Sequence, residues 1–151
     1  MRISAKADYA VRAAVEMAAA GDQPLKGEKI AEAQGIPLQF LEHILLELKH
    51  ARLVRARRGA RGGYWLAQPP EEITLANLIR AVEGPLANIQ DQAPEATKYP
   101  GNAEGLTGVW IAVRASLRRV LERVTVADLR DGQIPEEVLA LTEDEGAWLT
   151  R

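Results

Sequence analysis

The sequence predicts a mainly α-helical fold with one small β-hairpin, and two patterns carry this prediction. Apolar residues recur at helical spacing through 37–49, which predicts a helix with a single buried stripe. Directly afterwards the period falls to two in Val54–Arg57, which is typical of a half-buried strand. A helix followed at once by an arginine-rich hairpin is the order of a recognition helix and its wing. We therefore expect a winged helix-turn-helix domain.

Two earlier helices complete this domain. Ser4 is expected to cap a helix that runs to Ala20 and ends at Gly21. A shorter helix is expected over 27–34, followed by a tight turn at Gly35, because glycine adopts a left-handed backbone more easily than other residues. Two helices joined by a glycine-centred turn are the helix-turn-helix pattern.

The hairpin has a glycine-rich turn at 59–63 and a second strand over 64–67. Residues 1–70 carry 11 Lys+Arg against 7 Asp+Glu, whereas residues 71–151 carry 8 against 14. A local basic patch on a protein with a net charge of −2 favours a DNA contact over unspecific binding of polyanions. The patch comprises Lys49, Arg52, Arg55, Arg57, Arg58 and Arg61.

After the hairpin we expect a helix between an N-cap at Thr74 and a stop at Gly84, so the domain spans 1–84. Residues 85–105 form a polar stretch with three prolines and no pattern of regular structure. So long a connection is often functional, and we assign it as a linker and sensor loop.

A second helical region is expected over 106–131. Its apolar residues step by four and three positions, which is a heptad seam, and we expect this seam to be a dimer interface. The alternative is a long helix that packs on its own domain. A short helix capped by Thr125 and an acidic tail over 132–151, expected to be partly disordered, follow. The seam comprises Leu106, Trp110, Val113, Leu117, Val120 and Val124.

Composition argues against several classes of protein. The absence of cysteine removes disulfides, thiol chemistry and thiolate metal sites. An enzyme is not expected, because the sequence has no histidine–carboxylate constellation and the glycines of 59–63 lie in a hairpin, not in a phosphate-binding loop. With no signal peptide and no apolar run of about 18–20 residues, we expect no membrane contact and a cytoplasmic, nucleoid-associated protein.

Several short motifs follow one another in a fixed order. They are Met1–Arg12, Ile30-Ala-Glu-Ala-Gln-Gly-Ile, Phe40-Leu-Glu, Leu53-Val, Arg58-Gly with Gly62-Gly-Tyr, and Glu72-Ile-Thr-Leu with Ala81-Val-Glu-Gly. With these motifs the chain resembles, over about residues 1–130, the Rrf-two-type transcription regulators, relatives of the bacterial iron–sulfur cluster regulator, and in particular an actinobacterial branch. The resemblance implies a homodimer in which each wing and recognition helix reads half of a near-palindromic operator.

The chain departs from that family in the linker. Cluster-binding members carry three cysteines there, whereas residues 85–105 have none, so we expect no iron–sulfur cluster and no other cofactor. Asp8, His43 and His50 are candidate iron ligands without any accompanying thiolate. Cluster-free members sense by other means, some through partner proteins of cysteine and sulfur metabolism. We therefore expect a small-molecule or protein effector at 85–105; a protein–protein adaptor that uses the heptad helix alone is the rival interpretation.

The DNA contacts are expected on the recognition helix and on the hairpin. Gln39 and His43 are expected to reach base edges in the major groove. Phe40 either meets a thymine methyl group or packs against the scaffold. Arg58 is expected to enter the minor groove, whereas its neighbouring arginines hold phosphates. Glu42 lies at a family position that accepts from cytosine; the alternative is that it only repels phosphates and orients its neighbours. The full set is Gln39, Phe40, Glu42, His43, Arg55, Arg57, Arg58 and Arg61.

Overall fold

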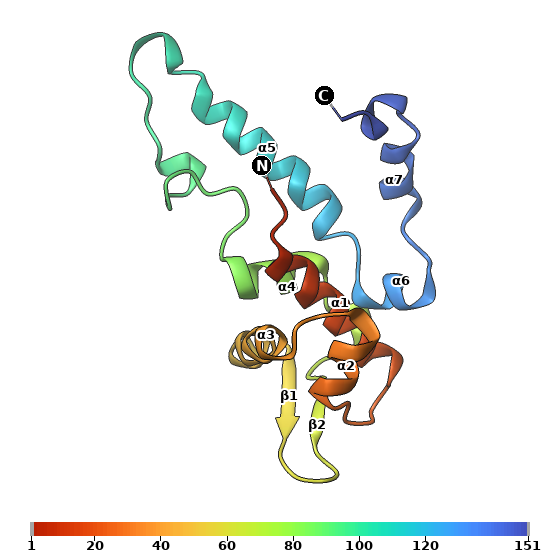
Figure 1. The fold of residues 1–151 in the computed structure, drawn as a ribbon. Helices are drawn as coiled ribbons and strands as arrows, with labels where there is room; N and C mark the ends of the chain where they lie inside the picture. The colour runs from red at the N-terminus through yellow and green to blue at the C-terminus, as the bar shows by residue number, and fades with distance from the viewer. Residues whose placement is uncertain (1, 151) are drawn as a thin grey trace.

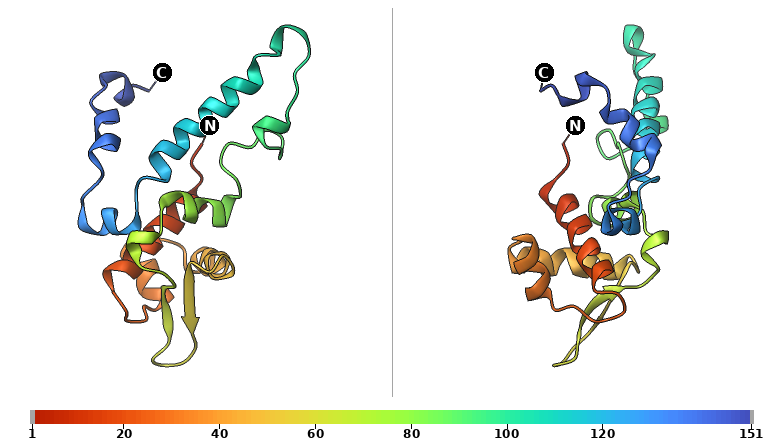
Figure 2. Two further views of the ribbon diagram at one scale, coloured as in Figure 1. Left: turned by 180° about the vertical axis from the view of Figure 1, so that it is seen from behind. Right: turned by 90° about the vertical axis from the view of Figure 1, so that its right-hand side faces the viewer.

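The structure is a computed structural model that describes residues 2–150, so residues 1 and 151 of the predicted domain and tail lie outside it. The fold is mainly α-helical with one two-stranded antiparallel sheet, as the sequence predicts. The hairpin and the long helix α5 project from opposite ends of the molecule (Figures 1 and 2). The elements are α1 Ala5–Ala19, α2 Gly27–Gln34, α3 Leu38–His50, β1 Val54–Arg57, β2 Gly63–Leu66, α4 Leu75–Glu83, α5 Leu106–Leu121, α6 Val126–Asp131 and α7 Glu136–Leu139.

The helix ends follow the sequence signals. The Ser4 hydroxyl accepts a hydrogen bond from the N–H of Ala7 at 3.0 Å, and Gly35 ends α2 with a φ of 61°. Thr74 and Thr125 each close a capping box, which satisfies N–H groups that have no partner within the helix. Pro37 was predicted inside the first turn of α3, but it is the N-cap, because its ψ of 125° is extended rather than helical.

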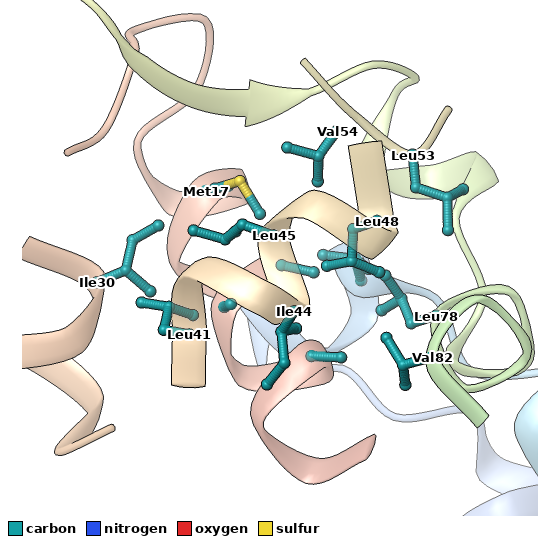
Figure 3. Close-up of a cluster of buried hydrophobic side chains, with 14 of the residues drawn as sticks. Met17, Ile30, Leu41, Ile44, Leu45, Leu48, Leu53, Val54, Leu78 and Val82 are labelled. Carbon is teal, nitrogen blue, oxygen red and sulfur yellow. The ribbon is translucent and has the colours of Figure 1, made fainter. Parts of the chain in front are cut away.

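The core lies between α1 and α3 (Figure 3). The apolar stripe of α3 is fully buried from Leu41 to Leu48, and alanines with no exposed surface face it from α1. Small side chains on one helix let the other approach closely, so the leucines of α3 fill the space between the two. The buried residues of this contact are Ala10, Ala13, Ala14, Met17, Leu41, Ile44, Leu45 and Leu48.

Residues 85–105 are less irregular than the sequence predicts. They contain two 3₁₀ turns, Pro94–Ala96 and Gly101–Ala103, and they lie against α5. Glu95 forms an ion pair of 2.7 Å with Arg114 of α5. Hydrogen bonds from its own backbone N–H and from Arg114 hold the pKa of the Glu95 carboxyl below its ordinary value. The segment is therefore attached to the long helix.

No residue of α5 is fully buried. Five of the six predicted seam residues are half-buried, on the side that faces the chain itself, and the large apolar side chains Val109 and Ile111 are exposed at 53% and 39%. Val124 is a correction: it follows the end of α5, is 3% exposed, and its carbonyl accepts from the N–H of Leu75. It packs within the chain and therefore does not belong to an outward seam.

The tail is locally folded where partial disorder was predicted. After α7 it forms two 3₁₀ turns, Ala140–Thr142 and Glu145–Trp148. The indole N–H of Trp148 donates to the carbonyl of Thr142 at 2.6 Å, which closes the segment on itself. Within residues 2–150, no helix combines the length and the apolarity needed to cross a membrane.

Candidate nucleic-acid interface

One face of α3 is open to solvent along its length. Because Leu41 and Leu45 anchor the opposite face, the side chains of Gln39, Glu42 and His43 are exposed. Gln39, Glu42 and His43 are spaced i, i+3, i+4, so they share one face of the helix. Leu46 lies on the same face, and 47% of its surface is exposed. An exposed apolar side chain in the middle of this polar face is a feature that the sequence analysis missed, although the spacing itself points to it.

Phe40 lies beside this face and packs against the scaffold. Its ring meets the ring of Tyr9 edge-on, with centroids 5.6 Å apart and planes at 78°. The guanidinium of Arg12 lies 5.3 Å from the Tyr9 ring centroid, and its Nε donates to Gln34 Oε1 at 2.9 Å. Of the two alternatives for Phe40, the structure favours scaffold packing, which fixes the start of α3 relative to α1.

The hairpin carries its four arginines exposed. β1 and β2 are antiparallel, and their paired residues run from Val54↔Leu66 to Arg57↔Gly63. β2 therefore begins and ends one residue earlier than the predicted strand, 64–67. Arg57 also stabilises the turn, because its Nη2 donates a hydrogen bond to the carbonyl of Arg61 at 2.9 Å. Arg55 and Arg58 keep their guanidinium groups free of protein hydrogen bonds among residues 2–150.

The hairpin is anchored to the segment before α2. Leu25 and Tyr64 exchange backbone hydrogen bonds of 2.9 and 2.8 Å, which adds a third short strand-like pairing. Gly63 has a φ of 149°, and a Cβ there would lie 2.7 Å from the carbonyl oxygen of Leu25, so no other residue fits without displacement. The ammonium of Lys26 donates to the carbonyl of Gly59 at 2.6 Å and so holds the tip.

A groove of about 390 Å³ separates α3 from the hairpin. Sequence reasoning missed Lys26, because nothing in the sequence signals a contact across 33 positions; Lys49 was counted as basic but not assigned to the site. Cationic side chains from three elements reach this groove, and the carboxylates of Glu28 and Glu42 lie among them. The cations are Lys26, Lys49, Arg57 and Arg58.

The candidate iron ligands lie outside any cluster of metal-ligating side chains within residues 2–150. Among residues 2–150 no group of three or more His, Cys, Asp or Glu side chains comes together. Asp8, a candidate ligand, instead pairs with Arg12 at 3.1 Å, and His43 and His50 lie exposed on α3.

Comparisons with known proteins agree with this geometry. The model of the Rrf2 family, described as an iron-dependent transcriptional regulator, matches residues 3–132. Rv1287 of Mycobacterium tuberculosis, named an HTH-type transcriptional regulator, is 50% identical over 145 residues, which are 95% of this chain and 90% of that protein. CymR of Bacillus subtilis, also named an HTH-type transcriptional regulator, is 33% identical over 85% of this chain and 89% of its own length.

Two solved structures extend this likeness to the fold. CymR, the global cysteine regulator of B. subtilis, superposes with a TM-score of 0.73 at 31% identity, over 87% of this chain and 97% of that one. IscR of T. potens gives 0.69 at 30% identity, over 100% and 93%. The exposed face of α3, the basic hairpin and these matches lead to one conclusion: the chain belongs to the Rrf2 family of helix-turn-helix transcriptional regulators, which bind DNA and are not enzymes.

Proposed function

We propose that the protein is a homodimer that regulates transcription at a near-palindromic operator, each chain reading one half-site. The observation that carries this proposal is the exposed polar face of α3 beside an arginine-rich hairpin. Helix-turn-helix dimers place two recognition helices about 34 Å apart, one turn of DNA, so two weak half-sites combine into one specific site. The exposed Val109 and Ile111 of α5 supply apolar surface for the pairing of two chains.

Base reading is assigned to α3. Glutamine matches the donor and acceptor of adenine, and histidine donates to guanine, so Gln39 and His43 read purines in the major groove. Leu46 lies one turn further along the same face, where its exposed methyl groups meet the methyl group of a thymine. Glu42 accepts from the amino group of cytosine and disfavours other bases by leaving its charge unpaired.

Positioning on the phosphates and reading of minor-groove shape are assigned to the hairpin. Arg58, exposed and next to the tip, enters the minor groove, where narrow A·T-rich tracts concentrate negative potential. Arg55 and Arg61 hold phosphates and set the register without reading sequence. Arg57 both approaches the backbone and braces the turn through its bond to Arg61.

We further propose that the protein works without an iron–sulfur cluster. Clusters of this kind are held by cysteine thiolates, which the chain lacks entirely. Among the acidic residues of 85–105, Glu95 is already paired with Arg114 and is therefore not a free substitute for a thiolate. Protein purified without oxygen is expected to be colourless, with neither iron nor acid-labile sulfide. A stoichiometric visible chromophore with bound iron would contradict this expectation.

The effector is assigned to the start of 85–105. A cavity of about 510 Å³ lies between α1, α4, α5 and residues 85–88, and is lined by Ile79, Leu86, Leu117 and Leu121. Its volume is that of small-molecule sites. Because its walls come from both the DNA-binding domain and α5, a ligand there changes the angle between them. A partner protein of sulfur metabolism is the second candidate, favoured by the likeness to the global cysteine regulator of B. subtilis.

DNA reading is tested after genomic footprinting has supplied an operator. Fluorescence anisotropy on operator and scrambled duplexes across a salt series separates the two classes of contact. Gln39→Ala and His43→Ala are expected to lose about 1–3 kcal/mol on the operator alone. Arg55→Ala is expected to weaken both duplexes and to lower the salt slope by about one. Gln133→Ala, an exposed glutamine in the tail, is the matched control.

Equal losses on both duplexes for Gln39→Ala and His43→Ala would show that the reading surface lies elsewhere. An adaptor that only uses α5 would bind neither duplex with a steep salt dependence. Dimerisation is tested separately by sedimentation of Val109→Glu and Ile111→Glu, which place charges at two exposed positions on different sides of α5. Retention of a folded dimer by both variants would exclude both positions from the interface.

A further inference from the structure

We propose that the acidic C-terminal segment of each chain, residues 133–150, packs over α5 of a second copy of the chain and closes the dimer. This inference rests on the homodimer proposed above. It concerns a segment that follows the region matched by the family model, residues 3–132. Three observations carry it: the preformed apolar surface of the tail, the open side of α5, and the opposite charges of the two.

The tail has a fixed local shape but leaves its large apolar side chains exposed. Asp144 accepts from the N–H of Gly146 at 2.9 Å, and Trp148 is tied to Thr142, yet Trp148 is 75% exposed. A segment already folded loses little conformational entropy when it binds, and a group of exposed large apolar residues marks an interaction surface. The exposed apolar residues are Leu139, Leu141, Trp148 and Leu149.

The tail does not bury these residues against its own α5. A groove of about 610 Å³ lies between α5 and α7, and one ion pair, Arg123–Glu137, bridges it. No residue of α7 is fully buried. Exposed arginines of α5 line this groove, and the helix also exposes small or apolar residues, which let another helix or segment approach closely. The exposed small or apolar residues are Gly108, Val109, Ile111, Ala112 and Ala115.

The two surfaces carry opposite charge. α5 has three arginines and no acidic residue, although Arg114 pairs with Glu95 and Arg118 with Glu122 of the same chain. Residues 132–150 have five acidic residues and no basic one. Within residues 2–150, Glu137 is the one member of these five that forms an ion pair, and Arg119, which lines the groove, forms none. Complementary charges guide association and disfavour other pairings. In a twofold dimer each contact occurs twice, so both tails close at once.

The absence of cysteine makes this arrangement directly testable. We would prepare Ala112→Cys on α5 and Ala147→Cys in the tail, both at exposed positions, in chains that carry different affinity tags. The two variants are mixed, allowed to exchange subunits, and treated with a short bis-maleimide. Peptide mapping then identifies which cysteines have been joined. Ala60→Cys at the tip of the hairpin, mixed with Ala147→Cys, is the control for random collision.

A 112–147 link between differently tagged chains is expected, with little or no 60–147 link. The double variant Ala112→Cys/Ala147→Cys tests the alternative that the tail folds onto its own helix. Linkage within one chain in that variant, without linkage between chains in the mixture, would overturn the proposal, as would the absence of any 112–147 link. Sedimentation of the unmodified protein keeps the two proposals distinguishable: a monomer defeats the homodimer itself, whereas a dimer without the link defeats only the placement of the tail.

A second measurement tests the energetic role of the tail. Trp148→Ser and Leu141→Ser are expected to raise the dissociation constant of the dimer about five- to thirtyfold, the range for buried interface residues. Thr150→Ala, an exposed tail residue without an apolar side chain, is the control. The helical circular dichroism of the DNA-binding domain should not change. An unaltered dissociation constant in both variants would exclude the tail from the interface.

Discussion

The two halves of this chain bury their apolar residues to different extents. In the DNA-binding half, α1, α3 and α4 share one core whose central side chains have no exposed surface. In the C-terminal half, α5 is 16 residues long and has no buried residue, and neither has α7. Exposed large apolar residues are concentrated there: six of the nine lie between 106 and 150. A helix of this length is marginal without tertiary packing, and the contacts of α5 with residues 85–105 and α4 leave none of its residues fully buried.

This difference separates residues that specify the fold from residues that specify assembly. In the first half, position on the helix decides the role, because Leu45 is buried and Leu46, the next residue, is exposed at 47%. In the second half, the apolar residues are divided between a side that faces the chain itself and a side that faces solvent. Substitutions in the first half should therefore act on the stability of one chain, and those in the second on association.

The largest effect is expected from Leu45→Ala. Removing a fully buried leucine from the core costs about 2–5 kcal/mol, the sum of lost transfer energy and the cavity left behind. Leu46→Ala is the matched control, with an expected change within about 0.5 kcal/mol in stability and a loss of operator affinity. Urea denaturation followed by circular dichroism measures both. Similar stability losses in the two variants would contradict the division of α3 into a core face and a reading face.

A smaller effect is expected from Gly63→Ala in the hairpin. The added Cβ would lie 2.7 Å from the Leu25 carbonyl oxygen, at a φ of 149° that non-glycine residues rarely adopt, so we expect a loss of about 1–3 kcal/mol. DNA affinity should fall as well, because the hairpin loses its anchor. Gly59→Ala is the control: its φ is 101°, but open space surrounds the Cβ, so strain alone acts. Equal effects on DNA affinity would mean that the Leu25–Tyr64 pairing does not position the hairpin.

The features that could be predicted from the sequence are those that depend on residues close together in the chain. The bounds of α2 and β1, the caps at Ser4, Thr74 and Thr125, and the buried stripe of α3 follow from local rules, since each depends on neighbours a few residues away. The contacts of the hairpin with Leu25 and Lys26 join positions about 33 to 39 apart, and no local pattern announces them.

The heptad seam shows a second limit of prediction from the sequence. Its period correctly predicted a long helix with an apolar side, but periodicity does not say what covers that side. Residues 85–105 cover part of the helix, because the 3₁₀ turn Pro94–Ala96 packs on α5 and Glu95 pairs with Arg114. Val124 continued the spacing in sequence although the helix had already ended at Leu121. The eight predicted DNA contacts are all exposed, and their roles on DNA stay predictions.

The smallest effect, expected from Gly108→Ala on α5, is also the one that best distinguishes assembly from folding. In a single chain nothing lies within 4 Å of a Cβ at this position, and alanine favours a helix over glycine by about 0.5–1 kcal/mol. The variant should therefore resist denaturation slightly better at concentrations where the chain is monomeric. Gly105→Ala, which also has open space around its Cβ but lies at the N-cap, is the control.

In the dimer the opposite sign is expected. If a second chain packs closely on this side of α5, the added methyl group meets it, and overpacking an interface costs more than the helix gains. Gly108→Ala should then raise the dissociation constant measured by sedimentation, while Gly105→Ala leaves it unchanged. Stabilisation of the monomer together with an unaltered dissociation constant would place the partner chain elsewhere on the helix. Opposite signs in the two measurements would show that this half of the molecule is completed by a second chain.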